Sequence, residues 1–167
     1  MTAHDPVDEI IRQWQSERPE LRASLPAMAH LGRLARCNAL LSPKLAAIFT
    51  QFGLNGGEFD VLATLRRAGA PFVLSPTALY ATLMVTSGTM THRLKLLENR
   101  GLITRLPNPE DSRSQLVQLS DEGKALIDQA VSAHLANENA LLSGLSEAEI
   151  QALDIGLRAL LREWEKD

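Results

Sequence analysis

The feature that most constrains the fold is a change of hydrophobic period between residues 102 and 119. On both sides of this segment, apolar residues recur every three or four positions, which is typical of amphipathic helices. Within it, two short β-like runs at 102–106 and 113–119 flank a polar, proline-containing turn at 107–111. The pattern predicts a β-hairpin with a polar tip, inserted into an otherwise helical chain.

Helix signals divide the chain before the hairpin. An N-terminal stripe of apolar residues at helical spacing is formed by Val7, Ile10, Ile11 and Trp14. A long amphipathic segment follows, and Ser42-Pro43 predicts a kink there or a new helix capped by Ser42. Asn55 to Glu58 and Ser75-Pro76 are the next helix starts. A helix over 87–100 is then expected to end at Gly101.

Two capping signals follow the hairpin. Ser120 is expected to cap one long helix, and Ser146 with Glu149 forms a capping box for the last. In that last helix the apolar residues form a seam suited to packing on another helix, made of Ile150, Leu153, Leu157, Leu160 and Trp164.

Together these elements predict a mostly α protein with a small β-hairpin, a winged helix–turn–helix with flanking dimerisation helices. We assign residues 1–52 to N-terminal helices that serve dimerisation and a ligand-pocket wall. Residues 53–120 form the winged helix–turn–helix, and residues 121–167 form C-terminal dimerisation helices.

A candidate DNA-reading face lies on the helix over 87–100. It is polar, it is separated from the apolar positions, and it consists of Ser87 at the helix start with Gly88, Thr91, His92 and Lys95. Small or hydrogen-bonding side chains on one face suit contacts with base edges and phosphates. At the hairpin tip, Arg113 suits a narrow minor groove, and Asp111 is placed to hold its guanidinium. The alternatives are an ordinary solvated helix face and a surface ion pair.

The distribution of charge favours DNA binding although the net charge of the chain is −3. Seven Lys or Arg and three acids fall within residues 66–113, which gives this segment a charge of +4 and the rest of the chain −7. A local basic region within an acidic chain is what phosphate binding requires.

Three stretches resemble the MarR family of transcription regulators. They are the segment from Gly57 to Arg67, the helix from Thr86 to Arg93, and the wing from Pro107 to Arg113 with the following Leu119-Ser120-Asp121-Glu122-Gly123. The resemblance implies a homodimer with a winged helix–turn–helix in each chain. It also implies binding to palindromic double-stranded DNA operators, usually as a repressor released by a ligand.

A narrower resemblance, to the urate-responsive, PecS-like branch, includes residues 13–19 ahead of the core. It implies that an anionic purine, urate or a relative, is bound by Trp14, Asp60, Arg93 and Arg105. An indole face and a planar guanidinium suit a flat anion. On this hypothesis Asp60 and Arg105 pair without ligand, and the anion repels Asp60 and competes for Arg105.

Each of these residues also has a simpler interpretation. Trp14 suits a dimer core, Asp60 a helix surface, Arg93 a phosphate contact and Arg105 an outward strand position. Cys37, the single cysteine, suits either a small buried residue or a redox switch, since Arg33 and Arg36 lie nearby. A further alternative is a ligand-binding interaction module that no longer reads DNA.

The sequence lacks the motifs that would indicate other classes of protein. The four histidines show no metal-ligand spacing, and neither a nucleophile elbow nor a phosphate-binding glycine loop is present, so we expect no enzyme, no metal site and no cofactor. The N-terminus lacks a signal-peptide pattern and no apolar run reaches 18 residues, so we expect a cytoplasmic protein without a membrane partner.

Overall fold

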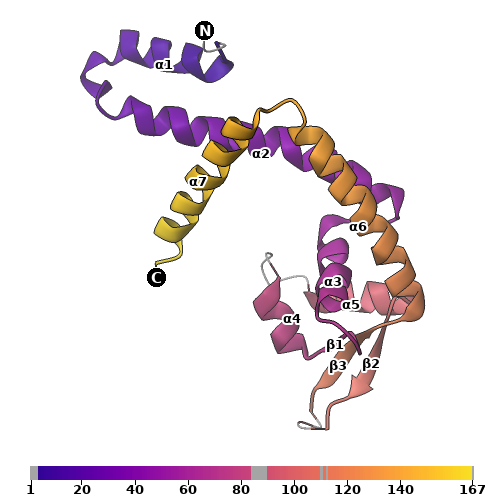
Figure 1. Cartoon of the computed structure of the whole chain (residues 1–167). Helices are drawn as coiled ribbons and strands as arrows, with labels where there is room; N and C mark the ends of the chain where they lie inside the picture. Colours follow the sequence, from indigo (N-terminus) through magenta and orange to yellow (C-terminus); the bar gives the residue numbers. More distant parts are fainter. Residues whose placement is uncertain (1–3, 84–89, 110, 112, 167) are drawn as a thin grey trace. The chain divides into compact units, whose positions relative to one another are not determined.

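The structure is a computed structural model that describes residues 4–83, 90–109, 111 and 113–166. It is mostly helical with one small antiparallel sheet, and the chain forms two compact units, residues 1–47 and 48–167 (Figure 1). The elements are α1 (Pro6–Glu17), a 3-10 turn η1 (Pro19–Leu21), α2 (Leu25–Gln51), α3 (Gly56–Arg67), β1 (Val73–Leu74), α4 (Pro76–Thr82), α5 (Met90–Asn99), β2 (Ile103–Pro107), β3 (Gln115–Leu119), α6 (Asp121–Leu142) and α7 (Glu147–Trp164). The predicted fold class is confirmed.

In the first unit, polar contacts fix the start of α1. The Asp5 side chain accepts hydrogen bonds from the amides of Val7 and Asp8, and the Asp8 side chain accepts from the Asp5 amide, which forms a capping box. Arg33 of α2 pairs with both carboxylates, with Nε 2.7 Å from the nearer Asp5 oxygen, and lowers the pKa of Asp5. Val7 is buried, and its side chain lies 3.5 Å from the Cβ position that Gly32 leaves empty.

The expectation at Ser42-Pro43 is wrong where it makes Ser42 an N-cap. The helix α2 runs from Leu25 to Gln51 with Pro43 inside it. The Ser42 hydroxyl instead donates to the carbonyl of Asn38, one turn earlier, at 2.8 Å. Ser42 is therefore a helix-interior serine bonded back to the preceding turn, an alternative that competes with capping.

The core of the second unit is built around α3. Its inward face carries Phe59, Val61, Leu62 and Leu65, and the neighbouring helices and strands add Leu79, Met90, Leu94, Leu97, Ile103, Val117 and Ile127, all buried. The predicted cap is confirmed, because the Asn55 side chain accepts from the Glu58 amide and Glu58 accepts from the Asn55 amide. Gly53 and Gly101 both have positive φ, at the ends of α2 and α5.

The sheet contains one strand more than the hairpin predicted from the sequence. The strands β2 and β3 pair antiparallel with Arg105 opposite Val117, as a hairpin requires. The strand β1 pairs with the other edge of β3, with Val73 opposite Gln118, so the order is β1-β3-β2.

A serine and a glycine join the hairpin to α6. The Ser120 hydroxyl donates to the Gly101 carbonyl at 2.7 Å and accepts from the Gly123 amide at 2.9 Å. A Cβ at Gly123 would collide with the carbonyl oxygen of Leu102, so only glycine allows this close approach. The predicted caps at Ser75, Ser120 and Ser146 are all confirmed.

Apolar side chains on the terminal helices remain in solvent. The helix α7 buries none of its residues, and large apolar side chains are exposed on it at Ile150, Leu153, Ile155, Leu157, Leu161 and Trp164. In the part of the chain that the structure describes, none of the helices combines the length and apolar character needed to span a bilayer.

Candidate functional site

The helix α5, which carries the predicted DNA-reading face, separates two kinds of side chain. Its buried face holds Met90, Leu94 and Leu97 in the core. Thr91, His92 and Lys95 are exposed on the opposite side. Ser87 and Gly88, the other two residues of the predicted reading face, lie outside the described residues. DNA contact by this face stays a prediction, but its described members are available for it.

The wing places its arginine as the sequence predicts. Asp111 accepts hydrogen bonds from the Arg113 amide at 3.0 Å and from Arg113 Nε at 3.1 Å. The Arg113 side chain is 91% exposed. A nearby Asn108 amide donates to the Ser114 hydroxyl at 2.7 Å and helps to define the turn. The wing tip therefore presents a positioned guanidinium to solvent.

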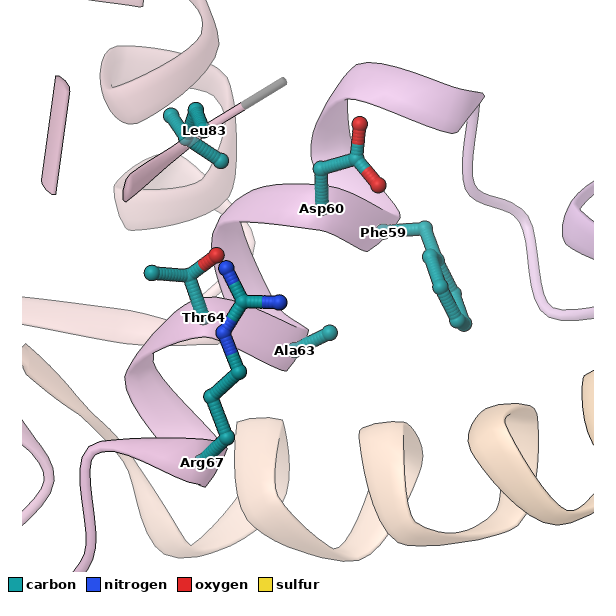
Figure 2. Close-up of a pocket in the computed structure, with 6 residues that line it drawn as sticks. All are labelled: Phe59, Asp60, Ala63, Thr64, Arg67 and Leu83. Carbon is teal, nitrogen blue, oxygen red and sulfur yellow. The ribbon is translucent and has the colours of Figure 1, made fainter. Parts of the chain in front are cut away.

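A small pocket lies beside α3, where the end of α4 faces it (Figure 2). Its volume is about 100 Å³. The described residues that line it are Phe59, Asp60, Ala63, Thr64, Arg67 and Leu83. Five of these come from α3, and Leu83 directly follows the last residue of α4. The walls of the pocket thus come from α3 and from the residue that follows α4.

Asp60 is the carboxylate of this pocket. Partial burial raises its pKa, while the charges of Arg67, then Arg93 and His134, act in the opposite direction. Desolvation is the largest of these effects, so the ionised form is disfavoured relative to water. A half-buried carboxylate whose pKa already responds to charges on α3, α5 and α6 is sensitive to a further charge brought into the pocket.

Arg93 lies against the first turn of α3. Its Nη1 is 2.8 Å from the position that a Cβ on Gly57 would occupy, so a larger residue at 57 would displace the guanidinium. Within the part of the chain that the structure describes, the same Nη1 is buried and has no hydrogen-bond partner. A buried guanidinium donor without an acceptor is costly, and an anionic oxygen would satisfy it.

Arg105 lies on the inner face of the sheet. It shares this face with Ile103 and Val117, both buried, and its side chain is only 25% exposed. The interpretation of Arg105 as an outward strand residue is therefore wrong. Its Nε pairs with Glu98 of α5 at 3.0 Å, so Glu98 replaces Asp60 as the partner of Arg105.

Two further candidates lie in the N-terminal unit. Trp14 lies on α1 and its side chain is 40% exposed. Cys37 on α2 is also exposed, so the interpretation as a small buried residue does not hold for the single chain. The four residues of the predicted ligand set are thus divided, since Asp60, Arg93 and Arg105 belong to the second unit.

Of the described lining residues only Asp60 was predicted from the sequence, and Arg67 is the charged one that was missed. Its Nη2 donates to the Thr82 carbonyl at 2.9 Å, at the end of α4. One signal was available, because Asp60, Ala63, Thr64 and Arg67 have the i, i+3, i+4, i+7 spacing of a single helix face. That spacing places Arg67 beside Asp60 but does not reveal the contact with α4.

Comparison with known proteins agrees with this architecture. The model of a family described as "MarR family" matches residues 52–114. The HTH-type transcriptional regulator PecS of Dickeya dadantii (strain 3937) is 42% identical over 160 residues, which is 96% of this chain and 93% of PecS. The chain belongs to the MarR family, on its PecS-like branch.

Solved MarR-family structures extend the comparison. A mutant MarR from E. coli, complexed with operator DNA, has a TM-score of 0.68 at 27% identity and covers 89% of this chain and 97% of its own. AbsC from Streptomyces coelicolor, another MarR-family regulator, has a TM-score of 0.74 at 18% identity over 84% of this chain and 95% of its own, which supports the fold alone. This MarR-family chain is a DNA-binding transcription regulator.

Proposed function

We propose that the protein is a homodimeric repressor that leaves a palindromic operator when urate or a related anionic purine binds. The ligand proposal rests on two charged groups beside α3 whose burial is not offset by hydrogen bonds or ion pairs among the described residues. Asp60 is a half-buried carboxylate with a raised pKa, and Arg93 has a buried donor that lacks an acceptor there. A partly buried carboxylate with a perturbed pKa in a cleft is typical of a binding site.

In this proposal Arg93 offers its free donor to an anionic oxygen of the ligand. A planar guanidinium matches a flat anion with adjacent oxygens better than a lysine does. The arriving charge also repels ionised Asp60. Since Arg93 lies on α5, a change in its position would be transmitted directly to the reading helix. The proposal also gives Trp14 a stacking or hydrogen-bonding part, on the resemblance to the PecS-like branch alone.

The DNA contacts follow from the exposed polar groups. We assign the major groove to Ser87, Gly88, Thr91, His92 and Lys95 of the reading helix. Arg113, held by Asp111, is assigned to the minor groove beside it. A palindromic operator requires two such units, with reading helices about 34 Å apart.

The exposed apolar side chains support the dimer. The α7 seam and the exposed Ile10, Met28 and Leu31 of the N-terminal unit are too apolar to remain in water without cost. A second copy of the chain is the partner that the two-fold symmetry of a palindrome requires. Size-exclusion chromatography with light scattering is expected to give twice the 18.3 kDa chain mass.

A titration tests the ligand proposal. Urate, xanthine and hypoxanthine are added to the complex of the protein with the DNA upstream of its own gene, and operator affinity is measured by fluorescence anisotropy. We expect urate to weaken binding to wild type but much less to Asp60→Asn. Asp128→Asn, which changes an exposed acid on α6, is the matched control and should respond like wild type. If none of the purines alters binding to wild type, the ligand proposal is wrong.

A redox-sensing regulator is the second candidate, because the Cys37 thiol is exposed. Oxidation of an accessible cysteine would then replace the purine as the signal. Peroxide is expected to release operator DNA from wild type but not from Cys37→Ser if this candidate is correct. Purine binding by a protein that shows no sequence-specific DNA binding would instead identify an interaction module.

A further inference from the structure

Arg67 joins the pocket to the helix–turn–helix. Its position on α3 puts it on the lining of the same pocket as Asp60. Its Nη2 also donates to the carbonyl oxygen of Thr82, the last residue of α4, at 2.9 Å. One side chain therefore contacts the pocket and the end of the first helix of the helix–turn–helix.

The pocket is small, which makes the contact between Arg67 and Thr82 relevant to ligand binding. A volume of about 100 Å³ is below the roughly 300–1,000 Å³ typical of small-molecule sites. A ring-sized anion therefore requires a wall to move. Leu83 is the described wall residue that does not come from α3, and it directly follows Thr82. Displacing the end of α4 would enlarge the pocket.

The charge of Arg67 already acts on the pocket. Among the charged groups that favour ionised Asp60, Arg67 has the largest effect. Its other partner, the Thr82 carbonyl, is a neutral acceptor. The guanidinium charge already strengthens the bond to this carbonyl, but an anionic oxygen adds a Coulombic attraction that the neutral carbonyl lacks. An anion in the pocket would therefore compete well against the carbonyl, and Arg67 is exposed enough to turn toward it.

Building on the proposed ligand-responsive function, we propose that Arg67 is the positioning residue that couples the pocket to the helix–turn–helix. In this mechanism the ligand anion takes the guanidinium from the Thr82 carbonyl, and the C-terminal end of α4 is released. The chain then leads directly from α4 into the segment that precedes α5. The coupling route runs from α3 to α4, while Arg105 remains paired with Glu98.

The experiment measures operator affinity with and without saturating urate. The proteins are wild type, Arg67→Gln, Arg67→Lys and Arg66→Gln. Arg66 is a matched control, because it is the adjacent arginine of α3 but pairs with Asp128 of α6. Urate binding to the free proteins is measured in parallel by calorimetry. Hydrogen exchange at the amides of Ala81 and Thr82 is followed with and without urate.

We expect urate to weaken operator binding by wild type and Arg66→Gln by a factor within the usual allosteric range of about 5–150. In Arg67→Gln the factor should fall below about 3 while urate still binds, and Arg67→Lys should recover part of it because its charge remains. Urate should also speed exchange at the end of α4 in wild type. A merely structural role of Arg67 would not produce this ligand-dependent change.

Two results would overturn the inference. If Arg67→Gln responds to urate as wild type does, or if urate leaves exchange at the end of α4 unchanged in wild type, Arg67 does not couple the pocket to α4, and the proposed function stands. If urate has no effect on operator binding by wild type, the ligand proposal and this inference fall together. The wild-type measurement alone therefore separates the two failures.

Discussion

The helices α3 to α5 and the terminal helices use their apolar side chains in opposite ways. The helices α3 to α5 bury Leu62, Leu65 and Leu97 completely within a single chain. By contrast α7 buries nothing, and Ile155 and Leu161 are 69% and 52% exposed. Burial of apolar surface stabilises by about 25 cal/mol per Å². The reading unit thus completes its core alone, while the terminal helices leave this stabilisation for a partner.

The largest expected effect is the loss of stability when a buried residue of α5 is shortened. Leu97 and Leu96 are adjacent on α5, but Leu97 is fully buried and Leu96 is 37% exposed. Leu97→Ala should lower the free energy of unfolding by about 2–5 kcal/mol, because it leaves a cavity in the core. Leu96→Ala changes the same chemical group and should cost under about 1 kcal/mol. Urea unfolding at one fixed protein concentration measures both. Similar losses for the two variants would contradict the burial pattern.

The second prediction tests the exposed apolar side chains of α7. Leu153→Glu combined with Leu157→Glu places two charges on the exposed seam, and neither residue belongs to the single-chain core. We expect the proposed dimer to dissociate and operator affinity to fall by about a hundredfold, since two linked reading units bind about 10²–10⁴ times better than one. Light scattering and anisotropy measure the two effects. Gln151→Ala on the same helix is the control, and helicity by circular dichroism should change little.

The wing supplies a smaller and purely local effect. Arg113 and Arg158 are both exposed arginines paired with an aspartate, but Arg113 lies at the wing tip and Arg158 on α7. Arg113→Ala should lower operator affinity and reduce the slope of log affinity against log salt by about 1, without a change in stability. Arg158→Ala should change neither quantity. An unchanged salt slope in Arg113→Ala would remove the wing from the DNA contacts.

Features that depend on residues within one helical turn of each other could be predicted from the sequence. The caps at Asn55, Ser75, Ser120 and Ser146 depend on a side chain and an amide three residues away, so their signals are local. The buried and exposed faces of α5 follow from periodicity in the same way. Candidate DNA-reading residues could therefore be chosen from the sequence, and their described members are exposed.

Features decided by tertiary contacts were missed. The strand β1 has two residues and exists because Val73 and Leu74 meet β3, which no periodicity reveals. The sequence hypothesis paired Arg105 with Asp60, and the fold instead brings it to Glu98. The role of Arg67 depends on the position of Thr82, fifteen residues later. In each case the chain had the right residue types, and their pairing was set by packing.

The smallest expected effect concerns how Asp60, the partly buried carboxylate of the pocket, changes the free energy of unfolding. Its pKa in the folded protein is raised above the ordinary value of 3.8, mainly by burial. The folded state therefore binds more protons than the unfolded state between the two pKa values, and stability decreases as pH rises through that interval.

Asp60→Asn removes the ionised form and should be slightly more stable than wild type at pH 7. The difference should vanish below about pH 3.8, where Asp60 is protonated in both states. Urea unfolding of the two proteins across this range measures it, and a variant less stable than wild type at pH 7 would mean that Arg67 and Arg93 stabilise the carboxylate more than burial destabilises it.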